Sequence, residues 1–320
     1  MKSILRKSSF WLLFLITGLS ISCNQHTGTG ESAMISAAVS TTAINKLASS
    51  SKKTLAPNFK KYWYAGDAEI TSYQLEQARY GEIRDGKAVL VYVSEPFNSE
   101  KQVKADRNNS ENIPVIKLNA TKKFLTGIYP YSIMSSTFYP VYDDRHAIKV
   151  SASIQEWCGQ VFSQLNNKEE FEITSHSYFE SEGDQQMTLS KSVLENELWI
   201  KIRVNPEGLP IGTTEVIPSF EYLRLSHKQL KAYQAELSLE TGASYNTYTI
   251  NYPKLKRSLS INFTKTFPYT IEGWTETSVS GYGSNSKTLT STATRISTLK
   301  TPYWRQNGNE DVSLRNALGL

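Results

Sequence analysis

The sequence predicts a mainly β protein: a curved antiparallel sheet or half-barrel, built from one or from two duplicated β units, after an N-terminal tether. The chain contains 18 Tyr, 12 Phe and 6 Trp, and aromatic and β-branched residues favour strands. Several segments alternate apolar and polar residues with period two, which is typical of half-buried strands. Gly, Pro and Asn separate these segments at short intervals, which favours antiparallel connections.

The first 22 residues have the pattern of an export signal. Lys2, Arg6 and Lys7 form a basic start without an acidic residue, and an apolar run from Phe10 to Ile21 follows. This run of about 12 residues is shorter than the roughly 20 that a membrane-spanning helix needs. A basic start, a short apolar core and small residues near its end predict a secretory signal peptide over residues 1–22.

The residues Ser20-Ile21-Ser22-Cys23 that close this segment resemble a bacterial lipobox. The resemblance implies that Cys23 is acylated, that the leader is cut before it, and that the lipidated cysteine becomes the N-terminus. The alternative is an ordinary leader whose Cys23 stays a thiol. Because two or more acyl chains anchor a protein stably, the membrane is the first expected partner.

The charge of the remaining chain argues against a nucleic-acid partner. Without the three leader charges, 32 basic residues stand against 30 acidic ones. A nearly neutral chain gives no reason to expect phosphate-backbone binding. A short basic cluster, Lys254, Lys256 and Arg257, alternates as the solvent-facing side of a strand would.

Residues 23–56 are predicted to be a flexible tether, since they are rich in Ser, Thr, Ala and Gly and lack aromatic residues after Cys23. Order is expected from Pro57, with one β unit over residues 57–195 and a second over 196–320, packed together. Residues 72–86 resemble 226–242, and "YPYSI" at 129–133 resembles "FPYTI" at 267–271. A duplication explains these matches, and so does chance similarity between aromatic-rich strands.

Individual strands follow from the alternation. Asp85-Gly86 predicts a hairpin turn, and a second hairpin is expected near Thr241-Gly242. In residues 148–155 the apolar side chains of Ile148, Val150, Ala152 and Ile154 share one face, and residues 198–204 repeat the pattern. Strands are also expected in the tail from Lys254 onward.

Cys158 lies between Trp157 and Gly159. A cysteine nucleophile needs a histidine that makes the thiolate, and the spacing selects none, so Cys158 is only a weak catalytic candidate. It is in phase with the apolar face of residues 148–154, and free cysteines are often buried. We therefore expect a core cysteine whose truncation costs stability.

One segment has the residue types of a metal site. His176, Glu180, Glu182 and Asp184 fall within nine residues, and imidazole and carboxylate groups ligate zinc or hard cations. However, Glu182-Gly183-Asp184 also suits a hairpin turn. We expect neither a resident metal nor another cofactor.

Aromatic groups are the candidates for ligand contact. Trp63, Tyr129, Tyr131 and Trp304 stand in clusters that would line a glycan or lipid groove. The alternative places them in the core and in cross-strand pairs, where strand aromatics are more often found.

Most of residues 57–320 resembles an uncharacterised family of Bacteroidota lipoproteins often labelled "septum formation inhibitor Maf". The runs "KYWYAGDAEITSYQLEQARYGEIRDG", "FLTGIYPYSIMSSTFYPV" and "IQEWCGQVFSQLNN" carry the resemblance. True Maf proteins are nucleotide pyrophosphatases with a Ser-x-Ser-Pro-Arg-Arg motif, and no Pro-Arg-Arg occurs in this chain. The resemblance therefore implies no catalytic residue and no pyrophosphatase activity.

Together these features predict a membrane-anchored envelope lipoprotein that acts as a non-catalytic binding or structural module for an apolar, glycan or protein ligand. The alternative is an envelope hydrolase that uses Cys158 or a metal near His176. Surface lipoproteins of Bacteroidota commonly carry an acidic or Lys-led stretch after the cysteine. Asn24–Gly30 has no acidic residue or lysine, so the periplasmic face of the outer membrane is expected, with surface exposure left open.

Overall fold

The computed structural model describes residue 55 and residues 57–320. The strands are β1 (Ala68–Arg79), β2 (Glu82–Asn98), β3 (Val103–Lys104), β4 (Ile113–Thr126), β5 (Tyr129–Pro140), β6 (Lys149–Glu156), β7 (Gly159–Asn167), β8 (Phe171–Ser177), β9 (Gln185–Leu189), β10 (Val193–Leu194), β11 (Gly212–Ile217), β12 (Tyr233–Thr241), β13 (Asn246–Tyr252), β14 (Arg257–Phe263), β15 (Ile271–Ser280) and β16 (Lys287–Thr301). The α-helices are α1 (Pro57–Trp63), α2 (Glu195–Val204), α3 (Phe220–Leu225) and α4 (Leu314–Ala317). Short 3₁₀ turns are η2 (Pro206–Gly208), η3 (Pro253–Leu255), η4 (Gly283–Asn285), η5 (Tyr303–Arg305) and η6 (Asn309–Ser313).

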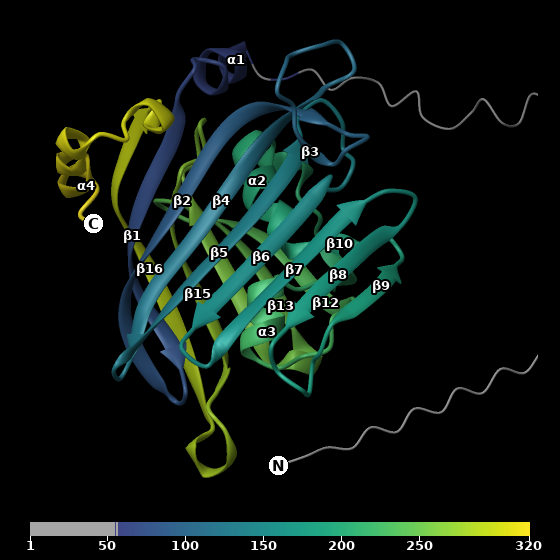
Figure 1. Cartoon of the computed structure of the whole chain (residues 1–320), viewed down its shortest axis with the longest axis vertical. Helices are drawn as coiled ribbons and strands as arrows, with labels where there is room; N and C mark the ends of the chain where they lie inside the picture. The colour runs from purple at the N-terminus through teal and green to yellow at the C-terminus, as the bar shows by residue number, and fades with distance from the viewer. Residues whose placement is uncertain (1–54, 56) are drawn as a thin grey trace, which may run out of the picture. The chain divides into compact units, whose positions relative to one another are not determined.

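All of these strands belong to one curved sheet (Figure 1). Its order is β10-β11-β12-β13-β14-β15-β16-β1-β2-β4-β5-β6-β7-β8-β9, with β3 paired to β2. The path is linear rather than closed, and only the short β10–β11 pair is parallel. The predicted mainly β, antiparallel fold is therefore confirmed. It differs from the alternating parallel strands and helices that a pyrophosphatase of the Maf type would need.

The residues of both predicted β units lie in this single sheet. Strands β1 to β9 form one half, β11 to β16 form the other, and β1 pairs with β16 where the halves meet. Of the segments matched as a repeat, residues 72–79 lie in β1, whereas residues 226–232 precede β12. Duplication stays a prediction, and the leader, Cys23 and the tether apart from Leu55 lie outside the described residues.

The first hairpin turns earlier than predicted. β1 and β2 are joined at Tyr80-Gly81, where both residues have positive φ (56° and 76°), as a type I′ turn requires. Asp85-Gly86 instead lies inside β2. A side chain at Gly86 would place its Cβ 2.4 Å from the carbonyl oxygen of Lys123, so this glycine permits the close approach of β4. The predicted hairpin at Thr241-Gly242 is confirmed between β12 and β13.

Residues 198–204 were expected to be a strand, and that prediction is wrong. They form most of α2, which lies against the inner face of the sheet (Figure 1). Side chains two residues apart point to nearly opposite sides of a helix. Leu198, Ile200 and Ile202 are nevertheless all buried, because the core surrounds the helix. Because both sides of the helix are buried, apolar residues two positions apart are tolerated, and this spacing resembles that of a strand.

Three buried charges attach α2 to the sheet and its loops. Glu195 accepts hydrogen bonds from Arg257 on β14, and Arg203 donates two, at 2.6 and 2.7 Å, to Glu69 on β1. Glu197 contacts His146 Nδ1 at 2.9 Å. Arg257 is thus 2% exposed rather than on a solvent-facing side, which corrects the prediction for the basic cluster. Lys254 and Lys256, its neighbours in sequence, are exposed.

Within the described residues, no helix is both long and apolar enough to cross a membrane.

Candidate functional site

The inner face of the sheet changes from apolar to polar along β1 and β15. Along β1, the inward side chains of Tyr73 and Leu75 are followed by Gln77 and Arg79. Along β15, Trp274 is followed by Glu276, Ser278 and Ser280, three inward polar residues. Polar side chains on the inner face do not pack into the hydrophobic core. They surround a cavity of about 370 Å³, which we call the polar cavity.

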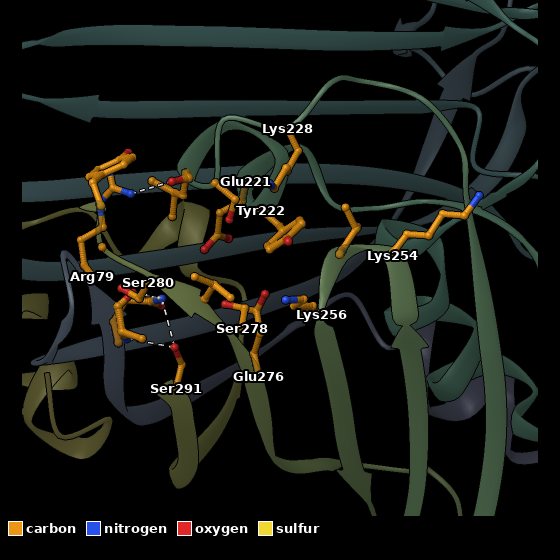
Figure 2. A pocket seen from close by; sticks show the side chains of 18 residues that line it. Arg79, Glu221, Tyr222, Lys228, Lys254, Lys256, Glu276, Ser278, Ser280 and Ser291 are labelled. Carbon is orange, nitrogen blue, oxygen red and sulfur yellow. Dashed lines mark hydrogen bonds between the residues drawn. The ribbon is translucent and has the colours of Figure 1, made fainter. Parts of the chain in front are cut away.

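Helix α3 forms the opposite wall of the polar cavity. Ser219 caps its start by accepting a hydrogen bond from the backbone N–H of Tyr222 at 3.3 Å. Arg79 of β1 donates to the carbonyl oxygen of Leu225 at 2.7 Å and so holds the other end. In Figure 2, Glu221 and Tyr222 face Glu276 across the cavity, and Lys254 extends away from it.

Both carboxylates of the cavity are held by cations. Lys122 Nζ lies 2.7 Å from Glu221 Oε1, and Arg257 Nε lies 2.6 Å from Glu276 Oε1. Burial raises the pKa of Glu276, but Arg257 and Lys122 outweigh it, so the pKa is lower than that of an ordinary Glu. Glu276 is therefore ionised at neutral pH. It can accept hydrogen bonds but is poorly suited to act as a general acid.

One buried acceptor in the cavity wall has no partner among the described protein atoms. Gln77 is 5% exposed, and its Nε2 donates to Ser291 Oγ at 3.2 Å. Its Oε1 makes no hydrogen bond. A buried polar atom without a partner costs about 1–3 kcal/mol. Because this oxygen is itself shielded from solvent, a hydroxyl group of a ligand in the cavity would reach it only after the Gln77 amide turns toward the cavity.

The turn between β1 and β2 follows Arg79, which lines the polar cavity. Tyr80 has φ 56°, which is uncommon for a residue other than Gly, Asn or Asp. Its hydroxyl contacts that of Tyr131 at 2.7 Å, and the guanidinium of Arg79 lies 4.2 Å from its ring centroid. Burial raises the pKa of Tyr80, but hydrogen bonds from Tyr129 and Tyr131 and the charge of Arg79 lower it overall. Tyr282, which also lines the cavity, is 58% exposed.

The prediction that Cys158 is buried is wrong. The apolar face of β6 continues only to Ile154. The strand ends at Glu156, which pairs with Gly159 across a two-residue turn. Trp157 and Cys158 form that turn, and Cys158 is an exposed free thiol. The strand stops before its alternation reaches the cysteine. The expected cost of truncating a core cysteine therefore does not apply.

The hollow around Cys158, of about 830 Å³, also includes His176 and Asp184. His176 Nδ1 contacts Asp184 Oδ2 at 3.2 Å, while the interactions of the described residues include no hydrogen bond between His176 and Cys158. A hydrogen bond with Glu156, and the charge of that carboxylate, raise the pKa of the Cys158 thiol. Because a cysteine nucleophile needs a lowered pKa, this hollow is a poor thiol active site.

We expect Cys158 to react with a thiol reagent in the folded protein, and Glu156→Gln to speed that reaction at any pH below the thiol pKa. Removing the carboxylate lowers the pKa and increases the thiolate fraction. Alkylation rates measured against pH test this, with Glu172→Gln as the control. Equal rates in wild type and Glu156→Gln would contradict the assigned role of Glu156.

The predicted metal candidates do not assemble into one site. Glu182 Oε1 instead contacts Arg224 Nη1 and His227 Nδ1, each at 3.1 Å. Glu180 is exposed. Among the described residues, no group of three or more His, Cys, Asp or Glu side chains is arranged to hold a metal ion.

The aromatic candidates do not form a common groove either. Trp63 is 1% exposed and packs on Tyr92 and under Arg203, and Tyr131, also 1% exposed, stacks on Phe124. Only Tyr129 and Tyr131 lie together, with ring centroids 6.0 Å apart. Trp304 is 44% exposed beside Tyr303. The side chains that line the polar cavity were missed. A signal for them was present, because the inward positions of β1 and β15 become polar along each strand.

Comparison with known proteins adds no assignment, since no protein-family model, no curated protein and no solved structure matches this chain. The resemblance to lipoproteins labelled Maf stays a prediction.

Proposed function

We propose that this protein is a non-catalytic, membrane-anchored envelope lipoprotein that binds a glycan in the polar cavity. The observation that carries the proposal is the set of polar groups that line the cavity: the amide of Gln77, the ionised Glu276 and the serine hydroxyls of β15. Saccharides present many hydroxyl donors and acceptors. A cavity of about 370 Å³ is within the usual size range for small-molecule sites.

The arrangement favours a polar ligand over an apolar one. The middle of the inner face is filled by α2 and by buried side chains of the core, which leaves the cavity at its polar end. Tyr282, which lines the cavity, offers an exposed ring for stacking on a sugar face. The carboxylates are paired with cations, an arrangement that suits hydrogen bonding rather than proton transfer.

The proposed location follows from Cys23. Acylation of this residue would hold the chain on the outer membrane, with the periplasmic face favoured and surface exposure as the alternative. The mass of the mature N-terminal peptide reads the acylation directly, and an unmodified cysteine there would rule it out. Helix α1, the first described element, lies at the end of the sheet opposite the polar cavity (Figure 1).

We expect wild-type protein to bind at least one member of a panel of neutral, amino and acidic oligosaccharides, and Gln77→Met to weaken that binding about tenfold. This loss corresponds to one hydrogen bond of about 1.4 kcal/mol. Titration calorimetry measures the affinity. Gln74→Met is the matched control, because Gln74 lies on the same strand and bonds to Asp85 outside the cavity.

Absence of binding by the whole panel at millimolar concentrations would overturn the glycan proposal. Equal affinities of wild type and Gln77→Met would show that a glycan binds elsewhere.

A further inference from the structure

Strand β9 is a free edge of the sheet. It ends the strand order, and within residues 57–320 its one partner strand is β8. Its sequence, QQMTL, contains no charged residue and no proline, the residues that usually protect an exposed edge from pairing with another chain. Backbone N–H and C=O groups along its outer side are therefore available to a further strand.

The free edge borders a groove that has room for side chains of such a strand. Residues 190–192 connect β9 directly to β10, the opposite edge of the sheet, so the two edges lie on the same side of the molecule (Figure 1). A groove of about 650 Å³, which we call the β9 groove, lies on the inner face of the sheet at this edge. Side chains of β7, β8 and β9, among them Met187 and Leu189, line one wall, and α3 with residues 227–231 lines the other.

The β9 groove carries positive charge. Arg224 is balanced by Glu182. Lys228 and Lys231 also line the groove, are exposed, and take part in no ion pair within the described chain. Burial and Arg224 lower the pKa of His227, so it adds no charge near pH 7. Two unbalanced lysines fit an added strand whose groove-facing side chains are acidic.

We infer that β9 is a docking site for an extended acidic segment of a protein partner, which adds to the sheet as a strand. Main-chain hydrogen bonds to β9 supply affinity, and alternate side chains of the segment enter the groove, as in other cases of strand addition. Acidic side chains at alternate positions of the segment enter the groove and meet Lys228 and Lys231, while the side chains between them point to the outer face of the sheet. Lys228 also lines the polar cavity (Figure 2), whereas Lys231 lines the β9 groove and not the polar cavity.

A labelled nine-residue peptide of alternating Glu and Val is the probe, added to the full chain in detergent. We expect saturable binding by fluorescence anisotropy, at least about tenfold weaker binding of the corresponding Lys-Val peptide, and weaker binding at high salt. The Lys231→Gln variant, which leaves the lining of the polar cavity unchanged, should lose about threefold in affinity. Lys287→Gln, on a strand outside the groove, should bind as wild type does.

Hydrogen exchange distinguishes strand addition from simple charge attraction. Bound peptide should slow the exchange of the amides in residues 185–189. Binding without such protection, equal binding of both peptides, or no binding would overturn the inference. So would protection of the same amides by self-association of the chain without peptide, because a second copy would then be the occupant. Saccharide binding in the polar cavity is measured separately, so either proposal can fail alone.

Discussion

Replacing Arg257 by Met should lower the free energy of unfolding by about 3–5 kcal/mol, because the change leaves buried carboxylates without their cation. The side chains of Arg257 and Glu195 are each 1% exposed, and Arg257 also holds Glu276 at 2.6 Å. The substitution disconnects α2 from β14 and releases a carboxylate of the polar cavity in one step. Denaturant unfolding measures the loss.

The control for this experiment is Arg295→Met. Arg295 makes a single contact with Glu272 at 2.8 Å, and its side chain is 35% exposed, so its removal should cost at most about 1 kcal/mol. In Arg257→Met the pKa of Glu276 should rise, because burial raises it and the lowering effect of the Arg257 charge is removed. The stability deficit should therefore shrink as the pH is lowered and Glu276 protonates. Similar losses in both variants would contradict a special role for the buried pair.

Replacing Glu69 by Leu should cost a similar amount, about 3–5 kcal/mol, because the buried guanidinium of Arg203 loses its two charged hydrogen bonds. Both side chains are at most 1% exposed, and Tyr62 also donates to Glu69. The double variant Glu69→Leu/Arg203→Met should recover most of the loss, since neither charge is then left unpaired. Urea unfolding of the four proteins in this double-mutant cycle gives the coupling free energy, with Glu172→Leu in the exposed pair with Lys168 as control.

The same pair predicts part of the acid sensitivity. Burial raises the pKa of Glu69, but Arg203 outweighs it, so the folded-state pKa lies below the ordinary value of 4.5. A carboxyl group with a lowered pKa stabilises the fold at pH values above its unfolded pKa. That contribution is lost as the pH falls through the lower, folded-state pKa. Wild type should therefore lose stability more steeply below pH 4.5 than Glu69→Leu does, and parallel pH profiles would contradict the assignment.

The sequence by itself determined the fold class and many strands, because strand alternation is a local property. Residues 148–155 show this: Val150, Ala152 and Ile154 point inward as the pattern requires. The turn at Thr241-Gly242 was also predictable from the sequence, because the conformational preferences of turn residues act within a few positions.

Other features depended on contacts between distant parts of the chain. The alternation of residues 198–204 suits a strand. These residues form a helix because packing against distant parts of the core buries both sides of it. Arg257 resembles a surface residue until Glu195, 62 positions away in sequence, supplies its partner. Cys158 was misplaced because local alternation does not reveal where a neighbouring strand turns. Gln77 and Glu276 meet in one cavity only because β1 and β15 both pair with β16. Local alternation sets the direction of each side chain, whereas the sheet order decides which side chains meet, and that order arises from the packing of the whole chain.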